Sequence, residues 1–434
     1  MDEAAVEFGM TKISNDQAIW ILLRLILVAH VDDVLICGDK EHSTGLMKYL
    51  ASKYKFKDLG PVGLYIGIYI IRDRYHHRLF LDQAFYVSEI FEDYNMTNCT
   101  PSAIPMDPKA TWDQQQDDIP LVGKEIKLYQ RAIGQLMYLM LATRPDIAYA
   151  VTKLAQFAAT PTNRHWAGVL KIMRYLRAHT SVQLCLGSTK PPMLVSPSTN
   201  LIGYFDASLM DCTKTRKSTG AYTFFLQSSC ISWASKKQDL IALSSTEAEF
   251  IAGTEAVKEL AWIIEFLEYL DFDEEIKTLH LIGDNPGVLA MAKSSDFRPR
   301  TKHIHTRERY ITYMVESGQC QISYILTKDM IADALTKALP REQHEYLAKL
   351  LGLVFGNEEK KTCHQCLVIF SSRNALHKHL RLANYYCDDS MPSLGKLMFE
   401  LDMKSGDADG STEGIQPQLG YADGSEYNTG DTDG

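Results

Sequence analysis

The chain has 434 residues, 46% of them apolar, and a net charge of −9. This length predicts two or three domains. The only candidate membrane span, residues 19–29, is too short and contains Arg24, so no membrane association is expected. Residues 388–434 alone carry a net charge of −9, so the acidic balance does not exclude a polyanionic ligand for the rest of the chain.

The first expected feature is a hairpin near the N-terminus. Residues 25–38 (LILVAHVDDVLICG) read as two hydrophobic strands joined by a tight turn that carries Asp32 and Asp33. Because Asp favours turns, an ordinary hairpin explains this pair as well as a functional site does.

The second expected feature is a basic stretch, residues 124–187, whose pattern is helical. It contains nine Lys or Arg residues and two acids, a net charge of +7. Such a cluster is typical of a surface that follows nucleic-acid phosphates, and Arg174 and Arg177 are our candidate contacts. The alternative is a set of solvated helix faces, in which Arg144 and Arg174 pair with local acids.

The third expected feature is an alternation of strands and helices between residues 198 and 345. Periodicity predicts strands at 201–207, 217–226 and 229–235, a helix at 247–270, a strand at 278–283, helices at 286–293 and 305–317, a strand at 320–326 and a helix from 329. Four acids lie at the ends of these elements: Asp206, Glu249, Asp284 and Asp333. Such positions allow carboxylates from distant segments to converge on one edge of a sheet.

Converging carboxylates indicate metal chemistry. Two-metal phosphodiester hydrolysis needs hard oxygen ligands that hold two magnesium ions about 3.5–4 Å apart. A tight acidic cluster without a Lys or Arg partner, as we expect here, points to bound cations, because such carboxylates raise one another's pKa. Glu247 forms a capping box with Ser244, so we assign Glu247 to the helix cap and Glu249 to the metal. Each acid taken alone is more simply explained as a solvated surface charge or a helix cap.

A short cysteine motif lies towards the C-terminus. Cys363, Cys366 and His379 have the spacing of a two-Cys, two-His zinc finger through its first His. The expected second His is missing. The segment is therefore either a zinc site completed by Cys387 or His377, or a degenerate segment without metal.

The last segment, residues 388–434, is rich in Gly, Asp, Ser and Thr, and we predict that it is disordered. The chain has nine cysteines, and those within the first 350 residues show no regular spacing. That pattern favours a reduced compartment, the nucleus or the cytoplasm.

Several sequence strings occur in a recognisable order: 216–220 (RKSTG), 232–238 (SWASKKQ), 243–249 (LSSTEAE), 300–304 (RTKHI) and 332–337 (ADALTK). They resemble the ribonuclease H domain of copia-type retrotransposon Pol polyproteins. The resemblance continues upstream at 25–38, 56–60 (FKDLG), 64–71 (LYIGIYII), 129–138 (YQRAIGQLMY), 143–149 (TRPDIAY) and 172–177 (IMRYLR).

The resemblance implies cleavage of the RNA strand of an RNA–DNA hybrid, or binding of another nucleic acid. Asp206, Glu249 and Asp284 would be the core ligands of two magnesium or manganese ions, and Asp333 would complete the second metal site. Lys302 and His303 lie in the RTKHI string and are expected to contact substrate. Bacterial ribonucleases H place a His before the last acid; the corresponding LTKDM string has none, so product release has no assigned residue.

The same resemblance makes Asp32 and Asp33 a remnant of a reverse transcriptase palm, where a polymerase holds catalytic metal. His30 stands where the family usually has Tyr. The family's fingers and first palm Asp have no counterpart in the roughly thirty residues before this turn. We therefore expect no DNA synthesis by this chain alone, and a full-length reverse transcriptase is a candidate partner.

These observations predict a multidomain protein of α/β and α+β class. Its expected parts are a truncated palm and thumb (1–115), a basic helical connection (124–187), a ribonuclease H-like mixed five-stranded sheet with flanking helices (198–345), a degenerate zinc-finger-like segment (360–387) and an acidic disordered tail (388–434). Two alternatives remain. One is a catalytically inactive relic or repurposed nucleic-acid-binding module, and the other is an inert interaction protein whose basic stretch is buried.

Overall fold

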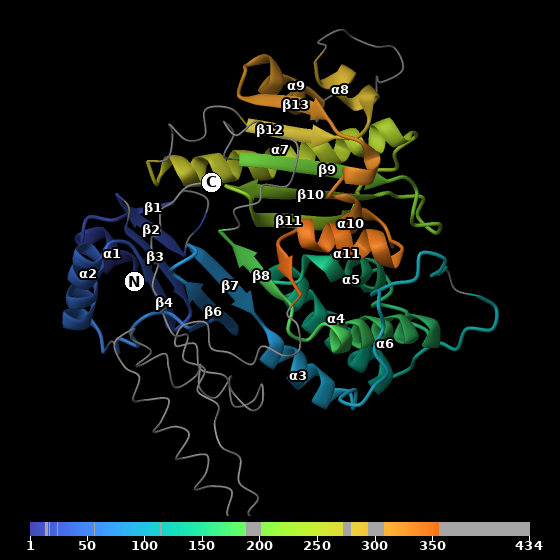
Figure 1. Cartoon of the computed structure of the whole chain (residues 1–434), viewed down its shortest axis with the longest axis horizontal. Coiled ribbons are helices and arrows are strands. Elements are labelled where there is room, and N and C mark those ends of the chain that lie inside the picture. Colours follow the sequence, from blue (N-terminus) through green and yellow to red (C-terminus); the bar gives the residue numbers. More distant parts are fainter. Residues whose placement is uncertain are drawn as a thin grey trace, which may run out of the picture. The chain divides into compact units, whose positions relative to one another are not determined.

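Figure 1 shows the computed structural model, which describes residues 1–355 except 14–15, 17, 24, 56, 113–114, 188–200, 272–278 and 294–307. The expected zinc-finger-like segment and the acidic tail lie outside the described residues. All described residues belong to one unit, Met1–Cys387. Among them, no helix combines the length and the apolar character needed to cross a membrane.

The N-terminal part is an antiparallel sheet of order β1-β2-β3-β4 with two helices packed on it. Its elements are α1 (Asp2–Glu7), β1 (Thr11–Lys12), β2 (Ile19–Leu22), β3 (Leu25–His30), β4 (Asp33–Cys37) and α2 (Lys40–Lys53). In β3, Leu25 and Leu27 are buried and their neighbours are less so, which is the alternation of a strand with one covered face. Asp39 caps α2 by accepting hydrogen bonds from the backbone of Glu41 and His42.

A second antiparallel sheet joins segments that are far apart in the sequence, in the order β14-β8-β7-β6-β5. Its strands are β5 (Leu64–Tyr65), β6 (Ile68–Asp73), β7 (Arg78–Asp82), β8 (Gln183–Leu186) and β14 (Leu353–Val354). The stretch that we expected to be helical therefore ends in a strand. Val182 and Leu184, two residues apart, are both buried in one cluster with Leu353, and this two-residue period is that of a strand.

Between β7 and β8 the chain is helical. The elements are α3 (Ala84–Asp93), α4 (Lys124–Ala142), a 3₁₀ turn at Pro145–Ile147, α5 (Ala148–Ala155) and α6 (Asn163–Ala178). Thr162 and His165 form a capping box at the start of α6, in which the Thr162 backbone N–H donates to His165 Nδ1 at 2.9 Å.

The third sheet is mixed and has the order β11-β10-β9-β12-β13. Its strands are β9 (Leu201–Ser208), β10 (Thr219–Leu226), β11 (Ser229–Lys237), β12 (Leu279–Gly283) and β13 (Cys320–Tyr324). The hairpin strands β9, β10 and β11 pair antiparallel, whereas β12 pairs parallel with both β9 and β13. The helices of this part are α7 (Ser245–Glu268), α8 (Pro286–Ala292), α9 (Glu308–Glu316), α10 (Asp333–Thr336) and α11 (Arg341–Leu350).

Each face of the third sheet has its own core. On one face Phe205 and Phe224 pack with the α7 residues Phe250, Val257 and Leu260. On the other face Tyr204 and Phe225, the sequence neighbours of Phe205 and Phe224, join Ala221 in a core that also contains residues of α4, α5, α6 and α10. Opposite faces for adjacent residues follow from the strand pleat.

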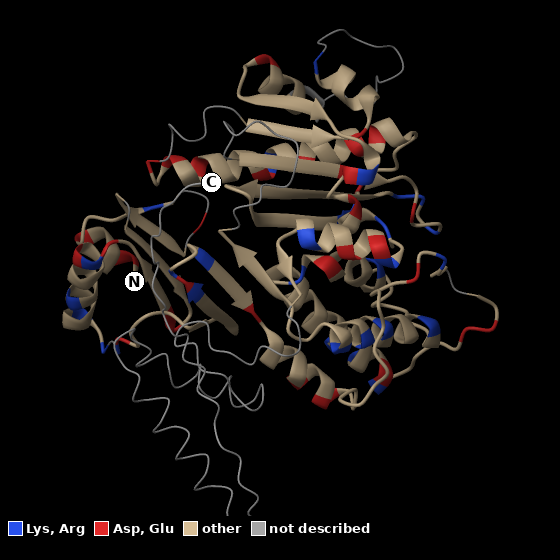
Figure 2. Ribbon diagram, in the orientation of Figure 1, with Lys and Arg blue, Asp and Glu red and all other residues tan. Residues whose placement is uncertain are grey.

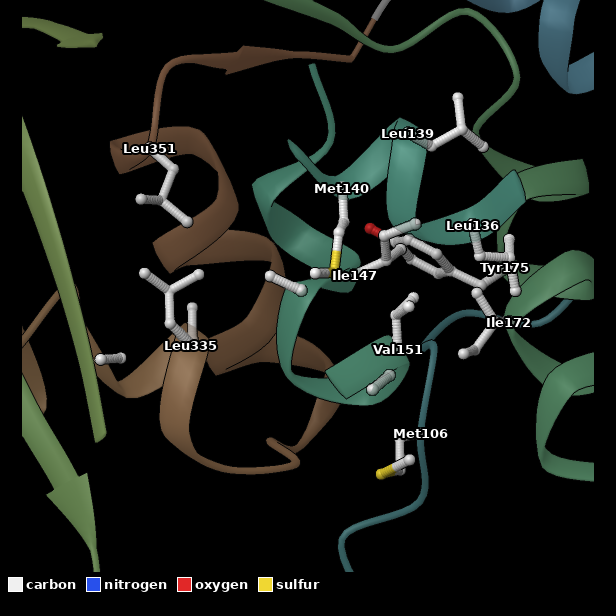
Figure 3. Packing of buried hydrophobic residues seen from close by; sticks show 14 of the residues in the cluster. Met106, Leu136, Leu139, Met140, Ile147, Val151, Ile172, Tyr175, Leu335 and Leu351 are labelled. Carbon is white, nitrogen blue, oxygen red and sulfur yellow. The ribbon is translucent and has the colours of Figure 1, made fainter. Parts of the chain in front are cut away.

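The second of these cores unites the helical connection with the C-terminal helices. Figure 3 shows Leu335 and Leu351 facing Met140, Ile147 and Val151, and the cluster contains all of them. One continuous apolar core thus spans residues that we expected in two domains. The expected domain limits stay a prediction.

The mixed α/β architecture with several sheets is confirmed. The segment from 201 to 350 shows strands and helices within a few residues of the expected positions, with one difference. The helix expected from residue 329 is divided in two, because α10, which begins at Asp333, ends after four residues at an extended Lys337 (φ −142°, ψ 152°). Helix α11 then begins after Pro340, which is extended and suits the start of a new helix.

Candidate metal centre

Two neighbouring parallel strands place Asp206 and Asp284 together. Asp206 lies in β9 opposite Ala221 of β10. In the parallel pair of β9 and β12, Ile282 is opposite Tyr204, so two residues further along each chain Asp284 follows β12 beside Asp206. The C-terminal ends of parallel strands meet at one edge of a sheet, as we expected for these acids.

Glu249 reaches the same edge from the start of α7. Ser244 caps this helix, and its Oγ accepts from the Glu247 backbone N–H at 3.1 Å. The Glu247 carboxylate accepts from the Leu243 backbone N–H at 2.8 Å. Glu247 is therefore used in the cap, as expected, and Glu249 faces the sheet. One carboxylate oxygen each from Asp206, Glu249 and Asp284 lies within 4.8 Å of the other two.

Two of these carboxylates, those of Asp206 and Glu249, are buried, and one oxygen of Glu249 has no hydrogen-bond partner among the described residues. Asp206 is 2% exposed and Glu249 is 7% exposed. Glu249 Oε1 accepts a hydrogen bond from Asn285 Nδ2 at 3.1 Å, but among the described residues Glu249 Oε2 has no partner. Burial, with added repulsion from Asp206 and Asp284, raises the pKa of Glu249 to about 7. Burial and the charge of Asp206 likewise raise the pKa of Asp284.

This arrangement fits a hard divalent cation. Three carboxylates from three elements supply oxygen ligands, one buried oxygen lacks a hydrogen-bond donor, and ionisation is opposed by burial. A divalent ion would neutralise the repulsion between the carboxylates and would bind the oxygen that lacks a hydrogen-bond donor. Oxygen ligands suit magnesium or manganese.

Asp333 lies next to this triad but is paired differently. It is 2% exposed at the start of α10, and Lys337 Nζ lies 2.8 Å from its Oδ1. The same Nζ lies 3.5 Å from Asp206 Oδ2, and Thr336 Oγ1 donates to that oxygen. Burial and Asp206 raise the pKa of Asp333 to about 7, despite Lys337. Burial opposes the ammonium, but Asp206 and Asp333 together raise the pKa of Lys337.

The expectation of an acidic cluster without a cationic partner is therefore wrong. Lys337 lies four residues after Asp333, a spacing that brings two side chains together on a helical segment. That spacing was readable in the ADALTK string and is the signal that could have found this residue. Asn285 and Thr336 were also missed, because hydroxyl and amide donors to a carboxylate leave no periodic pattern.

The expected Asp32 and Asp33 pair lies in the first sheet. β3 and β4 pair with His30 opposite Asp33, so Val31 and Asp32 form a two-residue turn. Both acids are exposed, and Val31 has a φ of +54°, a strained value for a β-branched residue. The metal-ligand group found among the described residues does not include them. Their role as a polymerase remnant stays a prediction.

The basic stretch divides into paired and unpaired cations. Arg144 and Lys153 are buried against Asp146 and Asp211, so neither is available to phosphate. Arg131, Arg164 and Lys171 have acidic partners on the surface. Within the described part of the chain, the cations of this stretch without an ion pair are Lys124, Lys127, Arg174 and Arg177, all of them exposed. Figure 2 shows Lys and Arg gathering along α4 and α6.

Five expected site residues cannot be placed. Lys302 and His303, expected to contact substrate, lie outside the described residues, as do the expected zinc ligands Cys363, Cys366 and His379. Substrate contact and zinc binding at these positions stay predictions.

Comparison with known proteins finds a matching family and relatives of one kind. The family described as Reverse transcriptase (RNA-dependent DNA polymerase) matches residues 2–108. The chain is 36% identical over 333 residues to the Retrovirus-related Pol polyprotein from transposon TNT 1-94 of Nicotiana tabacum, covering 76% of this chain and 24% of that protein. It is 30% identical over 358 residues to the polyprotein from transposon RE2 of Arabidopsis thaliana, covering 80% and 23%. The chain thus spans about a quarter of the length of these relatives.

One solved structure is also similar. It is RNase H1 from the halophilic archaeon Halobacterium salinarum NRC-1, at 14% identity and a TM-score of 0.22. The match covers 31% of this chain and 93% of that one. A score this low does not assign the fold.

Proposed function

Because the chain belongs to the copia-type retrotransposon Pol polyproteins, we propose that its third sheet is a ribonuclease H-like domain. In this proposal the acidic edge of the sheet hydrolyses the RNA strand of RNA–DNA hybrids with two divalent ions, magnesium or manganese. The observation that supports the proposal most is the convergence of Asp206, Glu249 and Asp284 from three separate elements, with Glu249 Oε2 lacking a partner among the described residues.

The four acids have distinct parts in this proposal. Asp206, Glu249 and Asp284 hold the first ion, and Asp206 and Asp333 flank the second. Bound divalent ions supply an activated water and stabilise the leaving oxygen of the phosphodiester. Asn285 holds the Glu249 carboxylate, and Thr336 holds Asp206, so that both ligands are oriented before an ion binds.

The proposed substrate surface uses cations without a protein partner. Arg174 and Arg177 on α6 are exposed and have no ion pair among the described residues, so their charge is available to a phosphate. Lys302 and His303 are proposed as further contacts on the strength of the resemblance of their sequence string. A hybrid duplex carries regularly spaced phosphates, and each contact of this kind releases a counterion and strengthens binding.

Hydrolysis of a hybrid with labelled RNA tests the proposal directly. The intact chain with magnesium is expected to release labelled RNA fragments, whereas Asp206→Asn is expected to release none. Asp239→Asn is the matched control, because Asp239 is exposed and lies in the loop between β11 and α7. Equal cleavage by wild type and Asp206→Asn would reject the assignment, as would an inactive wild type in both magnesium and manganese.

A second candidate is a nucleic-acid-binding module without catalysis. The observation that favours it is Lys337, whose ammonium already balances charge between Asp206 and Asp333. This function predicts hybrid binding by the wild type with no fragment release. Measuring binding and hydrolysis on the same preparation separates the two candidates.

A further inference from the structure

Lys337 is a cation built into the acidic site. Its Nζ lies 2.8 Å from Asp333 Oδ1 and 3.5 Å from Asp206 Oδ2, and the side chains of both acids are only 3% exposed. Such buried carboxylates need a counter-charge. Among the described residues, the ion pairs of Asp206 and Asp333 are both with Lys337. The acidic site thus has two sides. One side contains Glu249 and Asp284, and on the other side Lys337 lies between Asp206 and Asp333.

An ammonium and a divalent ion at this place would compete for the negative charge of Asp206 and Asp333. A magnesium ion binds carboxylate oxygens at about 2.0–2.1 Å. A divalent ion held by Asp206 and Asp333 would bring a second positive charge beside Lys337 Nζ, which lies 2.8 Å from Asp333 Oδ1 and 3.5 Å from Asp206 Oδ2, and the two charges would repel. The Lys337 side chain is 36% exposed, so its flexible stem gives it a way out towards solvent. On the other side, Glu249 and Asp284 have no ion pair among the described residues, so no comparable cation has to leave there before an ion binds.

We propose that Lys337 acts as the resident cation of the Asp206–Asp333 side and must be displaced before a second divalent ion binds there. The inference rests on the proposed metal site, but it does not require hydrolysis. It predicts ordered binding, in which the first ion occupies the side of Asp206, Glu249 and Asp284. The second ion binds more weakly because it replaces an existing ion pair. Lys337 is a positioning residue in this scheme, since it holds Asp206 and Asp333 together without touching the reacting atoms.

Calorimetric titration of the intact chain with manganese tests the order of binding. The wild type is expected to show one tighter and one weaker site. Lys337→Gln removes the charge at similar length and is expected to tighten the weaker site by about tenfold. Lys337→Arg keeps the charge and is expected to resemble the wild type. Lys293→Gln, at an exposed lysine that ends α8, is the matched control.

Thermal unfolding without metal gives a readout independent of metal binding. Lys337→Gln is expected to lower Tm by roughly 5 °C, because two buried carboxylates lose their counter-charge. Adding Asp333→Asn to Lys337→Gln should recover part of this loss, since fewer unpaired charges remain. This double variant keeps the test decisive if the single variant folds poorly.

Unchanged manganese affinities in Lys337→Gln, or a weakening of both sites, would overturn the inference. So would a metal-free Tm equal to that of the wild type and of Lys293→Gln. Hybrid hydrolysis measured on the same preparations reports separately on the proposed function. A wild type that cleaves hybrid while Lys337→Gln binds manganese unchanged would reject the inference alone.

Discussion

Arg144 and Asp146 form a buried bidentate ion pair, in which Arg144 Nε and Nη2 donate to the two carboxylate oxygens at 2.9 and 2.8 Å. Tyr175 donates to the same carboxylate at 2.7 Å. Arg144 Nη1 donates to the His179 carbonyl at 3.1 Å, and His344 Nε2 donates to the Asp146 carbonyl at 3.0 Å. The network ties the junction of α4 and α5 to α6 and α11, so one residue of the basic stretch serves the fold.

Replacing Arg144 should therefore destabilise the protein strongly. Arg144→Met leaves the Asp146 carboxylate buried without its cationic partner, and we expect a loss of about 3–5 kcal/mol in the free energy of unfolding. Urea unfolding followed by circular dichroism measures this value. Arg177→Met, at an exposed cation of α6, should change it by no more than about 0.5 kcal/mol. Equal effects of the two substitutions would contradict the structural role of Arg144.

The raised pKa of Glu249 predicts that removing its charge increases the stability of the metal-free protein, and that the increase depends on pH. The folded pKa is about 7 against an ordinary value of 4.5, so the folded state holds the proton more tightly than the unfolded state. Stability without metal must then fall as pH rises from about 4.5 to 7, and the whole penalty is present above pH 7. Glu249→Gln avoids this penalty. At pH 8 in EDTA we expect its Tm to exceed that of wild type by roughly 3–6 °C.

The same comparison at pH 5 should show a much smaller difference, because Glu249 is then protonated in the folded state. Glu268→Gln is a matched control on the same helix, since Glu268 is exposed near the end of α7. A gain of equal size at both pH values would show that the effect is not electrostatic. An increase in Tm for Glu268→Gln would likewise show that the effect does not arise from the buried charge of Glu249.

Salt dependence of hybrid binding tests Arg174 and Arg177, the cations of α6 that have no ion pair among the described residues. Each phosphate contact contributes roughly −0.7 to −0.9 to the slope of log affinity against log salt. Changing Arg174 and Arg177 together to Ala should flatten the slope by about one to two units. The measurement uses fluorescence anisotropy with Asp206→Asn protein, so that the hybrid stays intact.

Lys40 and Lys48 of α2 provide the control for that experiment. Both are exposed and have no ion pair within the described part of the chain. Changing this pair to Ala should leave the slope unaltered. If both double substitutions flatten the slope equally, the effect is one of overall charge. If neither changes the slope, the cations of α6 are solvated and do not contact phosphate.

The sequence predicts a structural feature where the residues that determine it lie close together in the chain. The strands around Asp206 and Asp284 were predictable, because alternating apolar residues and short buried runs are local patterns. Their convergence was also predictable, since parallel strands end at the same edge. The pairing of β8 with β14 was not, because the paired residues are about 170 positions apart and no period connects them.

The partners of charged residues, too, were harder to predict when they lie far apart in the sequence. The burial of Arg144 depends on Tyr175 and His344, which come from distant helices, so a count of cations overstated the exposed basic surface. Lys337 was missed for a different reason. Its partner Asp333 lies four residues away, but the same spacing is common in exposed ion pairs, and only the folded chain brings this pair beside Asp206.

Amide substitutions should separate the four acids by their position. Asp206→Asn, Glu249→Gln and Asp284→Asn each remove a charge from the group that lies within 4.8 Å, while keeping the shape of the side chain. We expect each to lower hybrid cleavage more than about 1,000-fold, which corresponds to about 4 kcal/mol of transition-state stabilisation. Asp333→Asn should be milder, about 10- to 100-fold, because Asp333 is paired with Lys337 and lies outside that group. Single-turnover cleavage at saturating magnesium measures these factors, and near-wild-type cleavage by Asp284→Asn would show that this cluster is not the active site.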